Sequence, residues 1–339
     1  MSLLAWIMCS MVGLVACGGE PEQVEGAVPA IQAGHVATRI FGGERDHDAA
    51  SGVVALRVGE GSSFELCTGA LIAPNMVLTA RHCLSKMLTP TIVCDQNGAS
   101  GSGDQVASDV DPASVSVYTT GKPSFAKAGN ARGKAIVHGE GAVLCDRDIA
   151  VLVLDRNIDD IPVLPVRVGS PLRAGETMRS VGYGRNDQSL PTGTRVLRGN
   201  VPVLAVGKGV SASRTPLGAH EFEVGLSTCQ GDSGGPAISE QTGEVFGVVS
   251  RAGECTDDFG HVYTSTAGQQ ELLAKAFAAA GQKASFTLPA SREAPAEAPA
   301  AVAPAQAGGC STSGNAPVDG LGLAGIALGV ATLLRRRAS

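Results

Sequence analysis

Short apolar runs, separated by segments rich in glycine, proline, asparagine and aspartate, recur along residues 40–280 of the chain. Runs of roughly four to eight aliphatic and β-branched residues bounded by such turn residues are typical of β-strands. Many short strands with turns between them predict an all-β barrel fold. The clearest runs are Val53–Val58, Ala70–Leu78, Ile149–Leu154, Val201–Val206 and Val245–Ser250.

A helix is predicted in one place only, at Gln269–Ala280, where alanine, leucine and glutamine predominate. The 339 residues carry a formal net charge of −6, which argues against a nucleic-acid partner. Residues 40–285 are long enough to bury a sizeable core.

The segment Cys229–Pro236 reads CQGDSGGP and places Ser233 in a glycine-rich turn. A tight turn alone would explain these residues. The same geometry would also let the backbone N–H groups of Gly231 and Ser233 stabilise charge on a neighbouring oxygen, as an oxyanion hole does. A serine hydroxyl is a weak nucleophile at neutral pH, so this interpretation requires a base and an acid elsewhere.

Candidates for both the base and the acid are present in the sequence. His82 is the one histidine of six that follows an apolar run and precedes a cysteine, which makes it the candidate base. Asp148 directly precedes the predicted strand Ile149–Leu154, so a rigid element fixes its position. Asp146 and Asp155 are the competing carboxylates, and the strand favours Asp148.

Four motifs in one order resemble the trypsin and chymotrypsin family of serine peptidases: RIFGG at residues 39–43, ARHC around His82, DIA at Asp148, and the segment around Ser233. The resemblance implies two six-stranded antiparallel β-barrels with a C-terminal helix over residues 40–285. It implies an endopeptidase that cleaves protein or peptide substrates through an acyl-enzyme on Ser233. The alternative is a catalytically inactive, surface-displayed homologue that acts as a binding module.

The resemblance also implies activation by cleavage at Arg39-Ile40, which would make residues 18–39 a propeptide or spacer. The new α-amino group of Ile40 would then pair with Asp232. A buried carboxylate is costly without its partner, so the uncut chain is expected to be a zymogen.

Specificity is expected to differ from that of trypsin. By the resemblance, Ser227 is the floor of the primary pocket, where trypsin-type enzymes have an aspartate. Ser250, Arg251 and Ala252 take the place of the family's Ser-Trp-Gly wall, and His261 replaces a wall glycine. The pocket is expected to accept either small or medium apolar side chains, or acidic side chains that pair with Arg251 and His261. We favour the first, because an exposed Arg251 would be solvated. The pocket should not cut after Arg39, so a different protease would activate the chain.

Six of the nine cysteines lie in the expected peptidase region. The resemblance pairs Cys67 with Cys83 and Cys229 with Cys255. Cys94 and Cys145 remain, and we pair them by elimination. Free buried thiols are the alternative, and export favours disulfides.

Both termini are expected to carry targeting signals. Residues 1–17 form an apolar export signal that resembles a bacterial lipoprotein signal with Cys17 as the lipidated residue, although no basic residue precedes it, and an ordinary secretory signal is the alternative. Residues 286–309 form a Pro/Ala-rich linker. Residues 310–339 resemble a MYXO-CTERM sorting tail, with Cys310, an apolar run and an arginine cluster, and a plain membrane anchor is the alternative.

The expected enzyme is thus exported, either secreted or held at the cell surface through processed termini, with its catalytic domain outside the cytoplasm. We expect a monomer that needs no metal or other cofactor. A calcium loop of the kind found in some family members stays an open alternative.

Overall fold

The structure is a computed structural model, and it describes residues 43–48, 51–96, 105–186, 190–284 and 286. The predicted signal, propeptide, linker and sorting tail, with Cys17, Arg39, Ile40 and Cys310, lie outside the described residues. Among the described residues, no helix has both the length and the apolar character needed to cross a bilayer.

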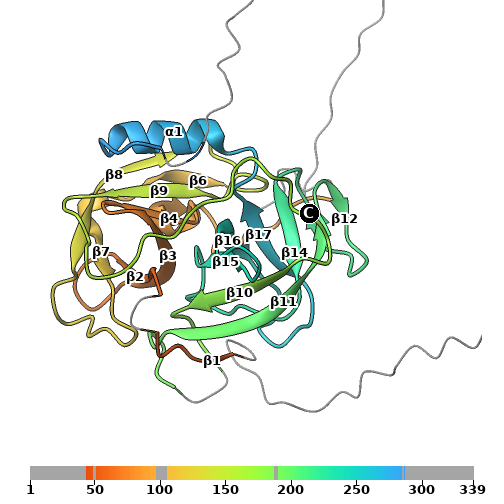
Figure 1. Cartoon of the computed structure of the whole chain (residues 1–339), viewed down its shortest axis with the longest axis horizontal. Coiled ribbons are helices and arrows are strands. Elements are labelled where there is room, and N and C mark those ends of the chain that lie inside the picture. Colours follow the sequence, from red (N-terminus) through yellow and green to blue (C-terminus); the bar gives the residue numbers. More distant parts are fainter. Residues whose placement is uncertain (1–42, 49–50, 97–104, 187–189, 285, 287–339) are drawn as a thin grey trace, which may run out of the picture. The chain divides into compact units, whose positions relative to one another are not determined.

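The first half of the described chain closes into a six-stranded antiparallel barrel with the order β2-β3-β4-β9-β8-β7 (Figure 1). Its strands are β2 (Val53–Val58), β3 (Glu65–Ala73), β4 (Met76–Thr79), β7 (Val115–Tyr118), β8 (Ala131–His138) and β9 (Ala150–Leu154). β4 and β9 are buried at every position, and β2 at every position except Arg57, and all three strands consist mostly of aliphatic residues.

The second half forms another antiparallel barrel, in which β11 pairs with both β10 and β14 and so closes the sheet. Its strands are β10 (Thr177–Gly182), β11 (Val196–Val206), β14 (Glu221–Val224), β15 (Pro236–Ser239), β16 (Val245–Arg251) and β17 (His261–Ser265). The predicted fold of two six-stranded barrels is therefore confirmed.

Shorter elements complete the two barrels. The edge strand β1 pairs with β11, β5 pairs with β6, and β12 pairs with β13. The 3-10 turn η1 carries His82, and the helix α1 packs its apolar face onto β8 and β9. Their bounds are β1 (Glu44–Arg45), η1 (His82–Leu84), β5 (Ser85–Met87), β6 (Val106–Asp109), η2 (Pro112–Ser114), β12 (Gly209–Val210), β13 (Pro216–Leu217) and α1 (Gln270–Ala279).

Several strand boundaries follow the apolar runs, although β11 begins at Val196, five residues before the predicted strand Val201–Val206. The predicted strand Ala70–Leu78 is wrong, because the run contains the end of β3, a turn at Pro74 and Asn75, and the start of β4. The turn is bonded to other parts of the chain: its two carbonyls accept from Ile158 and Leu154, at 2.7 and 2.9 Å. Apolar residues on both sides of this turn hid it from the sequence pattern.

The interface between the barrels is a continuous core. One cluster of buried residues contains side chains from β2, β3 and β4 of the first barrel and from β10, β15 and β16 of the second. Tyr183 crosses the interface, and its hydroxyl lies 3.2 Å from the carbonyl of Val53 and 3.1 Å from that of Thr120. Burial raises the pKa of Tyr183 to about 12, so the hydroxyl stays a neutral donor. Loops that meet at this interface are held rigidly by both barrels.

A buried ion pair fixes the start of the described chain. The Arg195 guanidinium is 2.7 Å from the Asp46 carboxylate, and these side chains are only 2% and 4% exposed. Arg195 Nη1 also donates to the Tyr183 hydroxyl at 3.2 Å. This pair, together with β1, attaches the residues that follow the predicted activation site to the second barrel.

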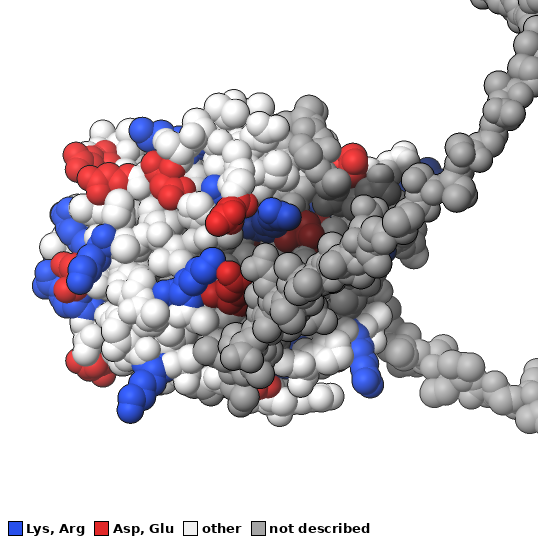
Figure 2. All heavy atoms as spheres, turned by 90° about the horizontal axis from the view of Figure 1, so that it is seen from above, with Lys and Arg blue, Asp and Glu red and all other residues white. Residues whose placement is uncertain are grey.

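Surface charge is mixed. On the face shown in Figure 2, the described basic and acidic side chains are interspersed over the molecule. The described residues on this face form no continuous basic strip of the kind that binds a nucleic-acid backbone.

Candidate active site

The Asp148 carboxylate lies at the centre of a hydrogen-bond network. It is fully buried and lies two residues before the start of β9. Its Oδ2 lies 2.7 Å from the Nδ1 of His82, and its Oδ1 accepts the backbone N–H of the same residue at 2.8 Å. The Ser250 hydroxyl, on β16, donates to Oδ2 at 2.8 Å. Three donors therefore hold one carboxylate in a single orientation. Of the competing acids, Asp146 pairs with His220 and Asp155 with Arg156.

His82 begins the turn η1, and two residues separate it from the end of the buried strand β4. Because Nδ1 faces a carboxylate, the proton lies on Nδ1 and leaves Nε2 free to accept one. Burial lowers the pKa of His82, but the charge of Asp148 and the hydrogen bond to it outweigh this, and the pKa is raised above its ordinary value. The imidazole is therefore a stronger base than a free histidine.

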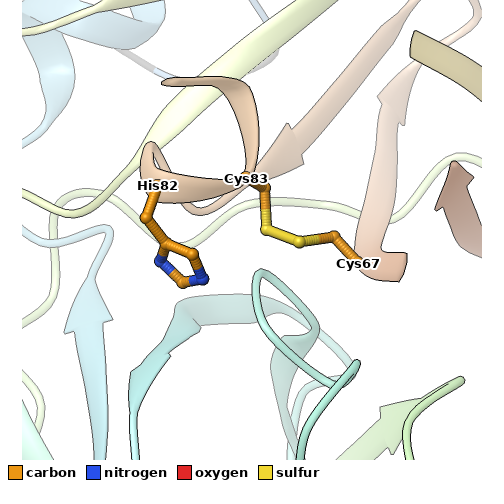
Figure 3. Close-up of side chains that lie close together, drawn as sticks. All are labelled: Cys67, His82 and Cys83. Carbon is orange, nitrogen blue, oxygen red and sulfur yellow. A yellow bond between two sulfur atoms is a disulfide. The ribbon is translucent and has the colours of Figure 1, made fainter. Parts of the chain in front are cut away.

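A disulfide anchors the histidine turn to the neighbouring strand. Cys83, next to His82, is bonded to Cys67 on β3 (Figure 3). The two sulfurs and a ring nitrogen of His82 lie within 4.8 Å of one another. Metal ligation by cysteine needs a thiolate, and both sulfurs are consumed by the disulfide, so this cluster is structural.

The Ser233 turn docks against the first barrel. The Ser233 carbonyl accepts the N–H of Thr68 at 2.8 Å, and the Gly231 carbonyl accepts the Thr68 hydroxyl at 2.9 Å. Gly234 has φ of +77°, and a Cβ there would lie 2.0 Å from the hydroxyl of Thr79, so the position needs glycine. The sulfur of Cys83 is 3.5 Å from the Ser233 carbonyl, which places the serine beside the histidine turn.

The backbone of this turn contains the two N–H groups that are expected from the sequence to form an oxyanion hole. Gly231 has φ of +96°, a left-handed value that glycine adopts easily. Within the described part of the chain, the N–H groups of Gly231 and Ser233 donate to no acceptor. Two unpaired N–H groups next to a serine hydroxyl can hold an oxyanion.

Asp232 is buried behind the same turn. It is 2% exposed, and it accepts the N–H of Gly184 at 2.8 Å and that of Cys229 at 2.9 Å. Burial raises its pKa to about 7, against the lowering effect of these hydrogen bonds. No Lys, Arg or His of the described residues forms an ion pair with it.

Two residues of the expected primary pocket, Ser227 and His261, lie close to β14 and β17 of the second barrel. Ser227 is fully buried shortly after β14, and His261 is fully buried at the start of β17. The Nε2 of His261 lies 2.9 Å from the carbonyl of Asp257, so it carries the proton, and Nδ1 accepts from the Thr228 hydroxyl at 2.9 Å. Burial is the largest cause of a lowered His261 pKa. His261 is therefore neutral, with both nitrogens occupied.

Arg251 differs from the expectation of an exposed, solvated side chain. Its side chain is 12% exposed, and Nη1 and Nη2 of its guanidinium donate to Oε1 and Oε2 of the buried Glu221, at 2.5 and 2.8 Å. Its charge is neutralised inside the protein, whereas the neighbouring Ala252 is exposed. The expectation that solvent surrounds the Arg251 charge is therefore wrong, because Glu221 pairs with it instead.

All three expected disulfides are present. Cys94 is bonded to Cys145, three residues before Asp148, and Cys229 is bonded to Cys255. The second of these ties the Ser233 turn to the loop between β16 and β17.

The sequence missed two residues that the fold brings to the site. Glu221 is the first residue of β14, whose sequence EFEV is not an apolar run, so the signal that indicated Asp148 is absent here. Thr228 is adjacent to Ser227 and Cys229, but its contact with His261 spans 33 residues, and no local pattern indicates it.

Comparison with known proteins shows the family to which the chain belongs. The family model described as Trypsin matches residues 40–272. A trypsin of Saccharopolyspora erythraea is 28% identical over 226 residues, which cover 64% of this chain and 88% of that protein. Protein masquerade of Drosophila melanogaster is 28% identical over 219 residues, and the match spans 20% of that longer protein.

Among solved structures, an inactivated protease paralogue of the scabies mite, SMIPP-S-I1, aligns with a TM-score of 0.52 at 17% identity, over 70% of this chain and 99% of that one. At this identity the likeness concerns the fold alone. Because the family model matches well over half of the sequence, the chain belongs to the trypsin family of serine peptidases.

Proposed function

We propose that the protein is a serine endopeptidase in which His82, Asp148 and Ser233 form the catalytic triad. One observation carries the proposal: Asp148 binds His82 through both the ring and the backbone, beside a serine turn with two unpaired N–H groups. This arrangement supplies a base, its orienting acid, a nucleophile and an oxyanion hole.

The proposed mechanism follows from these atoms. As the Ser233 oxygen attacks the peptide carbonyl, Nε2 of His82 takes the hydroxyl proton, and Asp148 stabilises the imidazolium. The N–H groups of Gly231 and Ser233 hold the tetrahedral oxyanion. The imidazolium then protonates the leaving amine, the C–N bond breaks, and an ester to Ser233 remains. Water, deprotonated by His82, attacks this ester and releases the acid and the free serine.

The chain is proposed to be made as a zymogen that is activated at Arg39-Ile40. The buried Asp232 supports this proposal, because its carboxylate accepts two backbone N–H groups but forms no ion pair with a cation among the described residues. The α-ammonium of Ile40 would supply that cation and lower the raised pKa of Asp232.

Primary specificity is proposed for small or medium uncharged side chains. Ser227 carries no charge to attract lysine or arginine. Arg251 is already neutralised by Glu221, and the neutral His261 presents no free N–H, so neither favours an acidic side chain. Cleavage after Arg39 would therefore require another protease with basic specificity.

Export is proposed on the basis of the disulfides and the sequence of the termini. Three disulfides are typical of proteins outside the reducing cytosol. Cys17 and Cys310 remain proposed processing or lipidation sites, and residues 18–39 and 286–309 remain proposed spacers. Mass spectrometry of the mature protein purified from its host would measure both ends and any lipid mass.

Labelling with a fluorophosphonate tests the proposed function against the inactive binding homologue. The purified chain would be nicked at Arg39-Ile40 with trypsin, the trypsin inhibited and removed, and the probe added. We expect strong labelling of the nicked chain, weak labelling of the intact chain, and none in nicked Ser233→Ala. A nicked, folded wild-type chain that does not react would contradict the peptidase and favour the binding homologue.

A further inference from the structure

Glu221 is a buried carboxylate that the proposed mechanism does not use. It begins β14, and its side chain is fully buried. Four donors surround its two oxygens: Nη1 and Nη2 of Arg251, the N–H of Asp146 at 2.9 Å and the N–H of Gly218 at 2.8 Å. A carboxylate this deeply buried and fully bonded fixes the position of everything that donates to it.

Two of these donors, Arg251 and Asp146, are close in sequence to Ser250 and to Asp148. Arg251 directly follows Ser250, whose hydroxyl donates to Asp148 at 2.8 Å. Asp146 lies two residues before Asp148 and has φ of +67°, a conformation that non-glycine residues seldom adopt without support. Glu221 thus holds both the segment that leads into Asp148 and the strand end that supplies its third hydrogen bond.

Close packing makes this connection rigid. A Cβ at Gly218 would lie 2.5 Å from the Cβ of Asp146, so the turn at Asp146 rests directly on the backbone beside Glu221. Movement of Glu221 would therefore be transmitted to the turn and to the end of β16.

We propose that Glu221 is a positioning residue of the active site, which keeps the Asp148 carboxylate aligned with His82 through Asp146 and through Arg251 and Ser250. The proposal deepens the proposed peptidase function and rests on it. The substitution Glu221→Asp tests it best, because it keeps the charge but withdraws the carboxylate by one methylene. All four hydrogen bonds can then no longer be made at once.

The matched control is Glu176→Asp. Glu176 binds both Nη atoms of Arg167 at 2.9 Å and the N–H of Arg173 at 2.8 Å, and it contacts none of the catalytic residues. The double variant Glu221→Gln with Arg251→Gln removes both charges of the pair and separates loss of alignment from loss of charge.

Two readouts distinguish positioning from a merely structural role. In nicked enzyme, Glu221→Asp should lower kcat by about 10- to 100-fold with little change in KM, because a small misplacement of a catalytic group has that effect. In the Ser233→Ala background, NMR titration should give a lower His82 pKa for Glu221→Asp and for the double variant than for the parent. Glu176→Asp should match the parent in both readouts.

An unchanged His82 pKa and kcat in folded Glu221→Asp would overturn the proposal. If Glu221→Asp does not fold, the double variant decides the matter by the same titration. The NMR measurement needs no turnover, so it remains informative even if the nicked wild-type chain proves inactive, an outcome that would contradict the proposed function separately.

Discussion

Asp148 binds His82 twice, through the backbone N–H at 2.8 Å and through the ring at 2.7 Å. The first bond fixes where the turn η1 begins, and the second fixes which ring nitrogen carries the proton. Orientation and tautomer of the base therefore depend on one buried carboxylate.

The substitution Asp148→Asn should lower kcat by about 10 000-fold while the fold is kept, because the amide no longer holds the productive tautomer. Steady-state kinetics of the nicked variants would measure this. Asp155→Asn is the control: its exposed pair with Arg156 lies outside the site, so its kcat should equal that of the parent. A kcat within tenfold of the parent for Asp148→Asn would exclude Asp148 as the triad acid.

Removal of the Ser250 hydroxyl should have a smaller effect. Ser250→Ala deletes one of three donors to Asp148, and a hydrogen bond to a charged group is worth ~1.5–3 kcal/mol, so we expect kcat to fall by about tenfold or more. Thr242→Ala, which removes the hydroxyl of an exposed residue bonded to Glu244, is the comparison that should leave kcat unchanged. Equal kcat values for the two variants would mean that Ser250 is not part of the network.

The pH dependence of kcat/KM should reflect the raised pKa of His82. The base must be neutral, so activity is lost as pH falls through this pKa, and the acid limb should lie above the ordinary histidine value of about 6.5. Removing the charge that raises this pKa, as in Asp148→Asn, should move the limb of the residual activity to lower pH. A limb at or below the ordinary value in the parent enzyme would contradict the assignment.

Asp232 should make the uncut chain less stable as pH rises. Its pKa is about 7 in the folded protein and near 4 when unfolded, so the folded state binds the extra proton and its stability decreases from about pH 4 to about pH 7. The loss is on the order of 4 kcal/mol. Urea unfolding at several pH values would measure it.

Asp232→Asn in the uncut chain should flatten this pH dependence, because the amide does not titrate. Nicking at Arg39-Ile40 should also reduce it, since the new ammonium favours the charged carboxylate. The same slope before and after nicking would show that Ile40 does not pair with Asp232.

The buried pair of Arg195 and Asp46 should be important for stability. Arg195→Met leaves Asp46 buried without a cation, which costs about 3–5 kcal/mol. Chemical denaturation would measure the loss. Arg156→Met, at an exposed pair, should unfold at the same denaturant concentration as the parent, and equal stability of both variants would contradict a structural role for Arg195.

Several elements could be predicted from the sequence because their signal is local. The strand Val53–Val58 is a continuous aliphatic run and was predicted with its observed bounds. The strand β8 was missed, because its alternating arginine and lysine residues break the apolar run. Two of the disulfides were predicted from the resemblance to the family, and the third was predicted by elimination among the remaining cysteines.

The environment of Arg251 could not be predicted in this way. Its partner Glu221 is 30 residues away, and the two meet only because β14 and β16 flank β17 in the second barrel. Side-chain charge in the primary pocket therefore depends on three-dimensional pairing, whereas the triad is indicated by short motifs.

Hydrolysis of a peptide library by the nicked chain, with nicked Ser233→Ala as the control, tests the central claim most directly. We predict cleavage after small or medium uncharged residues by the wild-type chain and none by the variant. Equal cleavage by both proteins, or none by a folded wild-type chain with Ile40 at its N-terminus, would contradict the account.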